Sequence, residues 1–371
     1  MTNRTTFTAV AVNVIVLSVC ITSFAIVDTR AIEDVRAKSV LNQDDLKAID
    51  TFVADAVNEI LRTREDEFAT ISKTRAILLS RSTSQVDNQV QYAQQFSESC
   101  VRHIRAALTE AATLPEPRDA KVSVNLLITA EALNDPAMVD LALPRLTDNS
   151  TPISYWATRI VTSKTVVDMI NQPNVNPKAR AILQTLNQEV AVAAPDALAL
   201  IVSFAAQIRV PESEALLLAI ADRRIADYTK GLDAQAPLDT MILKGLCAKL
   251  KSETADKTQC AQRFAQLYSY VIQRYAKAQA QLTDLQKQDL ISIIAEVEDK
   301  CVSLLLGQQQ SGLRRAIERE DPALLMEEHD RLLGSSSQEG RLPALLRFAY
   351  KTADGNTEQS FPLVLNSLTT G

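Results

Sequence analysis

The side chains that most often perform catalysis or bind metals are few in this chain. Its 371 residues include two histidines, His103 and His329, and five cysteines. Cys100 and His103 stand at positions i and i+3, so a helix would present them on one face as two metal ligands or as a thiol–imidazole pair. No nearby Cys, His or acidic residue completes a ligand set. We therefore interpret them as a half-buried cysteine and a surface histidine.

The second histidine lies in the run Glu327-Glu328-His329-Asp330. Helical di-metal sites use a Glu-x-x-His motif, with the acid three residues before the histidine. For His329 that position is Met326. We therefore interpret this run as a solvated helix face. G-x-S-x-G and H-E-x-x-H motifs are also absent from the sequence. The sequence thus predicts no catalytic residue, no cofactor-binding residue, no metal ligand and no cofactor.

Four cysteines follow the N-terminal apolar stretch: Cys100, Cys247, Cys260 and Cys301. If the chain is exported, they allow three sets of disulfide pairings. The stretch KSETAD, residues 251–256, has the composition of a turn between antiparallel helices, and Cys247 and Cys260 are equally far from its middle. We therefore predict a Cys247–Cys260 disulfide, with buried free thiols in a helical core as the alternative.

One segment of this acidic chain is locally basic. Residues 241–280 contain seven Lys or Arg and two acids, with three tyrosines between them. This balance favours a contact surface for an anionic polymer, lipid headgroups or an acidic partner, and the alternative is an ordinary solvated face whose acids lie nearby in space. The predicted contact residues are Lys244, Lys249, Lys251, Lys257, Arg263, Arg274 and Lys277.

The elements that position these residues are predicted to be helices. Glycine accounts for only 8 of 371 residues, the first glycine is Gly231 and the first proline is Pro115. More than a hundred residues without either residue type exclude a run of short strands and tight turns. The sequence therefore predicts an all-α fold. The net charge of −6 argues against general nucleic-acid binding, for which a basic balance is expected.

The N-terminal residues predict export. Residues 5–27 carry no charge and are long enough to span a bilayer, with Arg4 before them and Asp28 after them. Ser23-Phe24-Ala25 matches a small-x-small cleavage pattern, which places signal cleavage after Ala25. The alternatives are an uncleaved anchor, lipid attachment at Cys20, which Val19 disfavours, or a buried N-terminal helix. We expect residues 1–27 to be a signal peptide or anchor, with the remainder periplasmic or anchored outside the cytoplasm.

Residues 28–114 predict a long helical hairpin. Apolar residues recur at helical spacing over 42–81, and a second periodic run covers 86–114. A packed pair within a bundle and a projecting coiled coil are equally compatible with this pattern.

Prolines mark a repeating pattern in the next segment. Six X-Pro pairs precede apolar-periodic runs, and proline is well tolerated at the first position of a helix. Every second pair is separated by about 40 residues, the length of a two-helix solenoid repeat. These six prolines are Pro136, Pro152, Pro177, Pro195, Pro211 and Pro237.

The segment LNDPAMVDLALPRL, residues 133–146, resembles a HEAT repeat. The resemblance covers residues 118–250 and implies a curved stack of helix pairs that binds partners along an extended surface, with no chemistry of its own. We therefore expect a HEAT-like array over 118–252, further helices over 253–351, and an irregular tail or small hairpin over 352–371.

These features together favour a non-catalytic scaffold or adaptor that faces the cell envelope and binds a protein partner. Contact with a membrane is expected only through residues 1–27, if they are not cleaved. Two alternatives remain open: an all-α enzyme whose site the sequence does not reveal, and a membrane-anchored ectodomain that binds a ligand or senses a signal.

Overall fold

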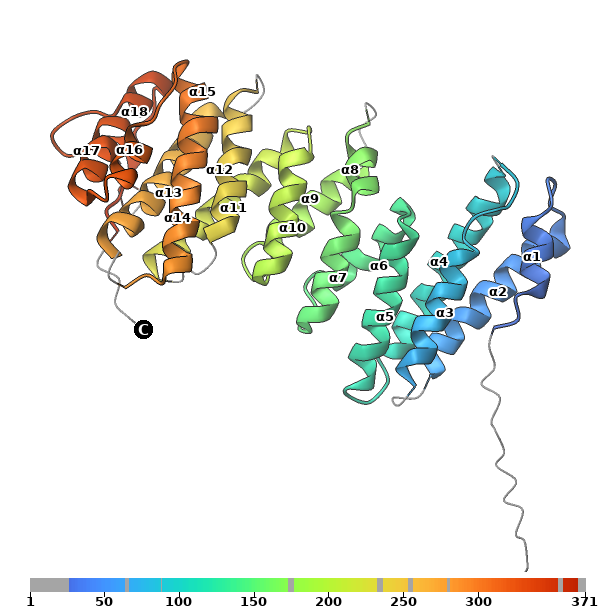
Figure 1. Ribbon diagram of the computed structural model, residues 1–371. Coiled ribbons are helices and arrows are strands. Elements are labelled where there is room, and N and C mark those ends of the chain that lie inside the picture. The colour runs from blue at the N-terminus through green and yellow to red at the C-terminus, as the bar shows by residue number, and fades with distance from the viewer. Residues whose placement is uncertain are drawn as a thin grey trace, which may run out of the picture.

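The computed structural model describes residues 27–63, 67–87, 89–172, 177–231, 236–252, 256–278, 281–352 and 356–365. Helices stand side by side in an elongated row that runs from α1 at one end to α17 at the other (Figure 1). None of the described helices is both long enough and apolar enough to cross a membrane. The predicted signal peptide or anchor, with its cleavage site at Ala25, lies outside the described residues except for Val27.

The N-terminal unit contains five helices: α1 (Arg30–Arg36), α2 (Gln43–Arg62), α3 (Phe68–Ser80), α4 (Val90–Ala111) and α5 (Arg118–Leu133). The single helix expected over 42–81 is wrong, because α2 ends at Arg62, and Thr63 has a non-helical backbone conformation with φ −55° and ψ 134°. The chain then folds back, so that the Thr83 carbonyl after α3 accepts a hydrogen bond from the side chain of Arg36, the last residue of α1. The unit is therefore a group of packed helices, with α2 against α4, rather than a two-helix hairpin.

The middle of the chain alternates short connections with helices. It begins with a bent helical segment formed by η1, α6 and η2, and the regular helix pairs follow. The elements are η1 (Pro136–Met138), α6 (Val139–Ala142), η2 (Leu143–Arg145), α7 (Thr151–Val161), α8 (Lys164–Ile170), α9 (Pro177–Glu189), α10 (Pro195–Gln207), α11 (Glu212–Thr229), α12 (Ala236–Leu250), α13 (Lys257–Ala278) and α14 (Asp284–Val297).

These helices stack in two layers. One layer contains α7, α10, α12 and α14, each packed against the next, and the other contains α9, α11 and α13. The layers meet where α11 packs on α10 and α12, and where α13 packs on α12 and α14. This arrangement of stacked helix pairs confirms the predicted all-α, HEAT-like array, and the row of pairs is visible in Figure 1.

The six prolines lie at or next to the starts of their helical elements, as predicted. Pro177 and Pro195 are the first residues of α9 and α10, and Pro211 directly precedes α11. Asp135 caps its element through the hydrogen bond from the Ala137 N–H to Asp135 Oδ1, at 2.8 Å. A proline at this position loses no helical hydrogen bond, which explains why the sequence locates the helix starts so well.

After α14 the chain forms a more irregular C-terminal unit. A π-helical turn, η3 (Glu298–Val302), extends α14 and directs the buried Glu298 carboxylate to the backbone N–H groups of Leu313 and Arg314, at 2.8 and 2.9 Å. The remaining elements are α15 (Ser303–Leu306), α16 (Gly312–Glu318), α17 (Pro322–Leu333), α18 (Arg341–Leu346), β1 (Tyr350–Lys351) and β2 (Glu358–Gln359). The two short strands pair antiparallel, with Tyr350 opposite Gln359.

Helix α13 is the most enclosed element of the C-terminal half. It packs against α11, α12, α14, α17 and α18, and nearly all of its side chains from Phe264 to Tyr275 are buried. These buried side chains include polar ones: Gln266, Ser269 and Gln273. A buried polar group is costly unless it is hydrogen-bonded, so the partners of these three residues determine what this part of the molecule does.

Candidate functional site

An open groove crosses the layer formed by α9, α11 and α13. It has a volume of about 540 Å³, and its apolar lining includes Ala215, Leu218 and Ala219 of α11. Three carboxylates also line it: Glu214 and Asp222 from α11, and Asp256 from the turn before α13. We call this surface the acidic groove. It combines apolar and negatively charged side chains of α11, and Asn187 of α9 and Gln259 of α13 extend it onto the neighbouring repeats.

Local hydrogen bonds fix the carboxylates of the acidic groove. Asp222 binds the Arg263 guanidinium through both oxygens, at 2.9 and 3.2 Å. Glu214 Oε1 accepts from the Asp256 N–H at 2.8 Å. The backbone and side chain of Gln259 donate to Asp256, and these bonds lower the pKa of the Asp256 carboxyl. The carboxylates are therefore ordered before any partner arrives.

The C-terminal residues 361–365, which we call the tail segment, lie along α13. Gln266 bonds both main-chain groups of Leu363: the Leu363 N–H donates to Oε1 at 2.8 Å, and Nε2 donates to the carbonyl at 3.3 Å. Gln273 accepts from the Leu365 N–H at 2.7 Å and donates to the Leu363 carbonyl at 3.0 Å. Lys277 donates to the Leu365 carbonyl at 3.3 Å. Side chains of α13 thus hold the tail segment through the main-chain groups of that segment.

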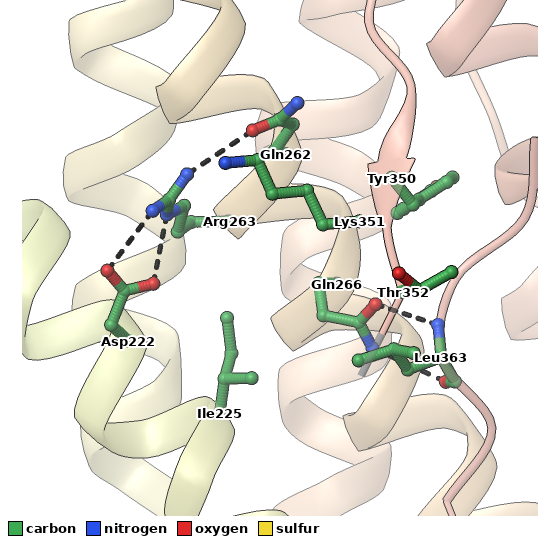
Figure 2. A pocket seen from close by; sticks show the side chains of 9 residues that line it. All are labelled: Asp222, Ile225, Gln262, Arg263, Gln266, Tyr350, Lys351, Thr352 and Leu363. Atoms are coloured by element: carbon green, nitrogen blue, oxygen red, sulfur yellow. Dashed lines mark hydrogen bonds and ion pairs between the residues drawn. The ribbon is translucent and has the colours of Figure 1, made fainter. Parts of the chain in front are cut away.

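A second cavity, of about 140 Å³, lies beside the tail segment. Figure 2 shows that Leu363 and Gln266 border it on one side, and that the Asp222–Arg263 ion pair lies on the other. Ile225 of α11 and Tyr350 of β1 also line it. Asp222 lines both this cavity and the acidic groove, so the two adjoin on the same face of the array.

Behind the tail segment, a chain of buried hydrogen bonds links α13 to α17. Gln273 Nε2 donates to Ser269 Oγ at 2.8 Å, Ser269 Oγ is 2.8 Å from His329 Nε2, and His329 Nδ1 is 2.8 Å from Asp330 Oδ1. In the neutral imidazole, a proton on Nδ1 is donated to Asp330, and Nε2 accepts from Ser269. The interpretation of His329 as part of a solvated face is therefore wrong, because the residue is buried.

The order Ser269, His329, Asp330 matches that of a hydrolytic triad, but the surroundings do not. Ser269 is fully buried in the middle of α13 and its oxygen already accepts from Gln273. A nucleophile must reach its substrate and lie near donors that stabilise the oxyanion. We interpret the three residues as a polar network, buried at Ser269 and His329, that orients Gln273, one of the residues that hold the tail segment.

The other histidine joins a charged cluster between α2 and α4. His103 Nε2 lies 2.7 Å from Asp50 Oδ1, and Arg102 also donates to this oxygen. Burial acts to raise the pKa of Asp50, but hydrogen bonds from His103, Arg102 and Ser99 outweigh it, so that the pKa is lowered. The neighbouring Cys100 is fully buried, not half-buried as expected. Within the described ranges, no three His, Cys, Asp or Glu side chains gather as metal ligands.

The cysteines Cys100, Cys247, Cys260 and Cys301 are buried and carry free thiols. The predicted Cys247–Cys260 disulfide is not formed in the structure. Cys247 instead hydrogen-bonds Cys301 of the π-helical turn, which lowers the pKa of Cys247 and raises that of Cys301. Burial raises the pKa of Cys260 to about 12. The pairing of these thiols in exported protein stays a prediction.

The seven basic residues of 241–280 contact different neighbours. Lys244 binds Glu296 of α14 at 2.5 Å, whereas Arg263 binds Asp222 of α11. Of the others, Arg274 is buried, Lys249 and Lys277 donate hydrogen bonds to neighbouring segments, and Lys251 and Lys257 are exposed. Acids that are distant in sequence thus pair with two of the seven, Lys244 and Arg263, and the proposed surface for an anionic partner stays a prediction.

Comparisons with known proteins reveal similarity only at the level of structure. No protein-family model matches the chain, and no curated protein matches it. Among solved structures it is similar to Kap121p, with 15% identity over 81% of this chain and 33% of that one, at a TM-score of 0.35. An engineered protein matches at 12% identity over 81% of this chain and 99% of the other, at a TM-score of 0.21. The chain spans about a third of the length of Kap121p.

Proposed function

We propose that this chain is a non-catalytic helical scaffold that holds a protein partner along the face formed by α9, α11 and α13. The observation that carries the proposal is the acidic groove, which is about 540 Å³ in volume and crosses three successive helices of one layer. The groove is open rather than enclosing, and a surface of this shape suits a polypeptide that lies across several repeats better than a small molecule that must be enclosed.

The charges of the acidic groove indicate the chemistry of the partner. Glu214, Asp222 and Asp256 carry negative charge beside the apolar residues of the groove, and among the residues that the structure describes only Asp222 has a close ion pair, with Arg263. Electrostatic complementarity favours a partner segment with basic side chains flanking small apolar ones. The association should weaken with added salt, because exposed charges are screened over about 8 Å at physiological ionic strength.

The scaffold is proposed to work outside the cytoplasm, at the cell envelope. The uncharged stretch 5–27, the preceding Arg4 and the following Asp28 support this location. N-terminal sequencing of the mature protein tests it: Ile26 as the first residue indicates a cleaved signal peptide, and an intact start indicates an anchor. Contact with the membrane is then confined to residues 1–27 of an uncleaved chain.

Capture of the partner from intact envelopes tests the binding function. The full chain should retain one stoichiometric protein, and Ala215→Arg should lose it, because Ala215 is an exposed residue in the acidic groove and the new side chain adds bulk and positive charge. Ala248→Arg is the matched control, on an exposed position of α12 in the other layer. Retention of no protein by the wild-type chain, together with turnover in an activity screen, would overturn the proposal.

A further inference from the structure

We propose that the face of α13 that carries Gln266 and Gln273 is a recognition site for an extended, apolar segment of a partner protein, and that the tail segment occupies this site in cis as a built-in competitor. The inference rests on the proposed scaffold function. It adds that an apolar segment of the partner binds α13, and that the tail segment regulates this binding by competition. The site adjoins the acidic groove, since Asp222 lines both cavities.

The contacts of this site are with main-chain groups. Gln266 and Gln273 together bond the Leu363 N–H, the Leu363 carbonyl and the Leu365 N–H, at 2.7 to 3.3 Å. Every polypeptide except one with proline at those positions offers the same donors and acceptors. Main-chain bonds of this kind provide affinity for any extended segment, and side-chain pockets provide specificity. The site is therefore suited to segments other than the one it holds.

The site is also ordered by residues outside the tail segment. Ser269 accepts one hydrogen bond from the Gln273 amide, and His329 of α17 in turn fixes Ser269. Neither of these bonds involves residues 361–365. Preorganisation of this kind reduces the entropy that is lost when a segment binds.

The tail segment does not fill the site. A cavity of about 140 Å³ lies next to Leu363, bordered by Ile225 and the aliphatic part of Lys351 (Figure 2). Pro362 and Leu365 are buried, but Val364 is 58% exposed. A partner segment with an aromatic side chain at the position of Leu363 would bury more apolar surface. We expect it to bind about tenfold more tightly, which corresponds to roughly 1.4 kcal/mol of binding free energy. The chain's own segment has the advantage of its high effective concentration, on the order of millimolar for a short flexible link.

Peptide binding to the full chain tests the proposal. The probes are fluorescent, C-terminally amidated peptides with the sequence of residues 358–365, either unchanged or with Leu363→Phe. The protein is the full chain with Leu365→Asp, which weakens the cis contact because Leu365 is buried. Fluorescence anisotropy should show binding that is about tenfold tighter for the Leu363→Phe peptide. The wild-type chain, whose site is occupied, should bind both peptides at least about tenfold more weakly than the variant.

Two controls identify the atoms involved. N-methylation of the peptide at Leu363 and Leu365 removes the donors to Gln266 and Gln273, and should weaken binding roughly tenfold or more. Gln273→Ala in the Leu365→Asp chain should have a similar effect. The matched control is Gln94→Ala, an exposed glutamine of α4 that bonds Glu98. Equal binding of N-methylated and unmodified peptides would overturn the proposal.

If the Leu365→Asp chain does not fold, amide hydrogen exchange on the wild-type chain provides a second test. Excess Leu363→Phe peptide should accelerate exchange at the amides of residues 361–365, since it displaces them. Unchanged exchange at saturating peptide would overturn the proposal. Ala215→Arg should leave peptide affinity unchanged. If this variant retains the envelope partner while peptide binding is intact, only the acidic-groove function is refuted. Retention of that partner without peptide binding refutes only this inference.

Discussion

At the scale of single residues, the array depends on a few buried polar groups whose partners lie on neighbouring helices. The Arg224 guanidinium of α11 binds both oxygens of Asp239 in α12, at 2.7 and 3.1 Å, and the Tyr228 hydroxyl donates to Asp239 at 2.6 Å. The side chains of Arg224 and Asp239 are fully buried. Removing one partner of such a pair leaves an uncompensated charge in the core.

We therefore expect Asp239→Ala to lower the free energy of unfolding by about 3–5 kcal/mol. The matched control is Asp168→Ala, which removes an ion pair with Lys164 whose side chains are 60% and 81% exposed. An exposed pair of this kind contributes less than about 1 kcal/mol. Urea denaturation of both variants measures the difference. Similar losses for the two would show that burial does not determine the contribution of Asp239.

At the scale of elements, end signals decide where helices start and stop. In α2, the Asn42 side chain accepts from the Asp45 N–H and Asp45 accepts from the Asn42 N–H, both at 3.0 Å. The same helix ends at Arg62, where the sequence Arg62-Thr63-Arg64-Glu65-Asp66-Glu67 offers no apolar residue. Without an apolar side chain every three or four residues, the helix has no face to pack on the core. This gap explains why the helix expected over 42–81 is divided.

The stability of the protein should depend on the side chains that cap its helices. We expect Thr283→Ala to cost about 1 kcal/mol of stability, because the Thr283 side chain accepts from the Gln286 N–H at the start of α14. Ser150→Ala is the control, since Ser150 precedes α7 without a side-chain cap bond, and it should change stability by less than about 0.5 kcal/mol. Thermal denaturation compares them. A larger loss from Ser150→Ala would contradict the assignment of the cap.

At the scale of the whole molecule, each helix pair contacts mainly its neighbours. Gly245 of α12 illustrates how closely the pairs approach: a Cβ atom at this position would lie 3.3 Å from Leu217 of α11 and 3.8 Å from Ala206 of α10. In a stacked array, stability is approximately a sum of the repeats and the interfaces between them. Damage at one interface should therefore stay local.

Gly245→Leu tests this locality. We expect a loss of about 1–3 kcal/mol, because the added side chain overpacks the junction of α10, α11 and α12. Amide exchange should accelerate in these three helices and remain unchanged in α2 and α4, which lie several repeats away. The control is Ala248→Leu, at an exposed position of the same helix. Uniform acceleration along the whole chain would show that the array unfolds as one cooperative unit.

Local sequence determined the helical class of this protein and the starts of its repeats. Scarce glycine favours helices over tight turns, and a proline affects only the helical turn in which it lies. Pro177 and Pro195 therefore mark the starts of α9 and α10 whatever the rest of the chain does. The polar stretch 251–256 also predicted a break between two helices, and α12 ends at Leu250 while α13 begins at Lys257.

Only the tertiary structure decided which distant residues meet. It brought Cys301 to Cys247, Glu296 to Lys244, and the buried His329 to Ser269. The tail segment reaches Gln266 across 97 residues of sequence. A periodic pattern shows that a helix has an apolar face, but it does not specify which other helix covers that face. The candidate sites of this protein consist of such long-range contacts. For that reason the sequence predicted the helical array but not the acidic groove or the face of α13 that holds the tail segment.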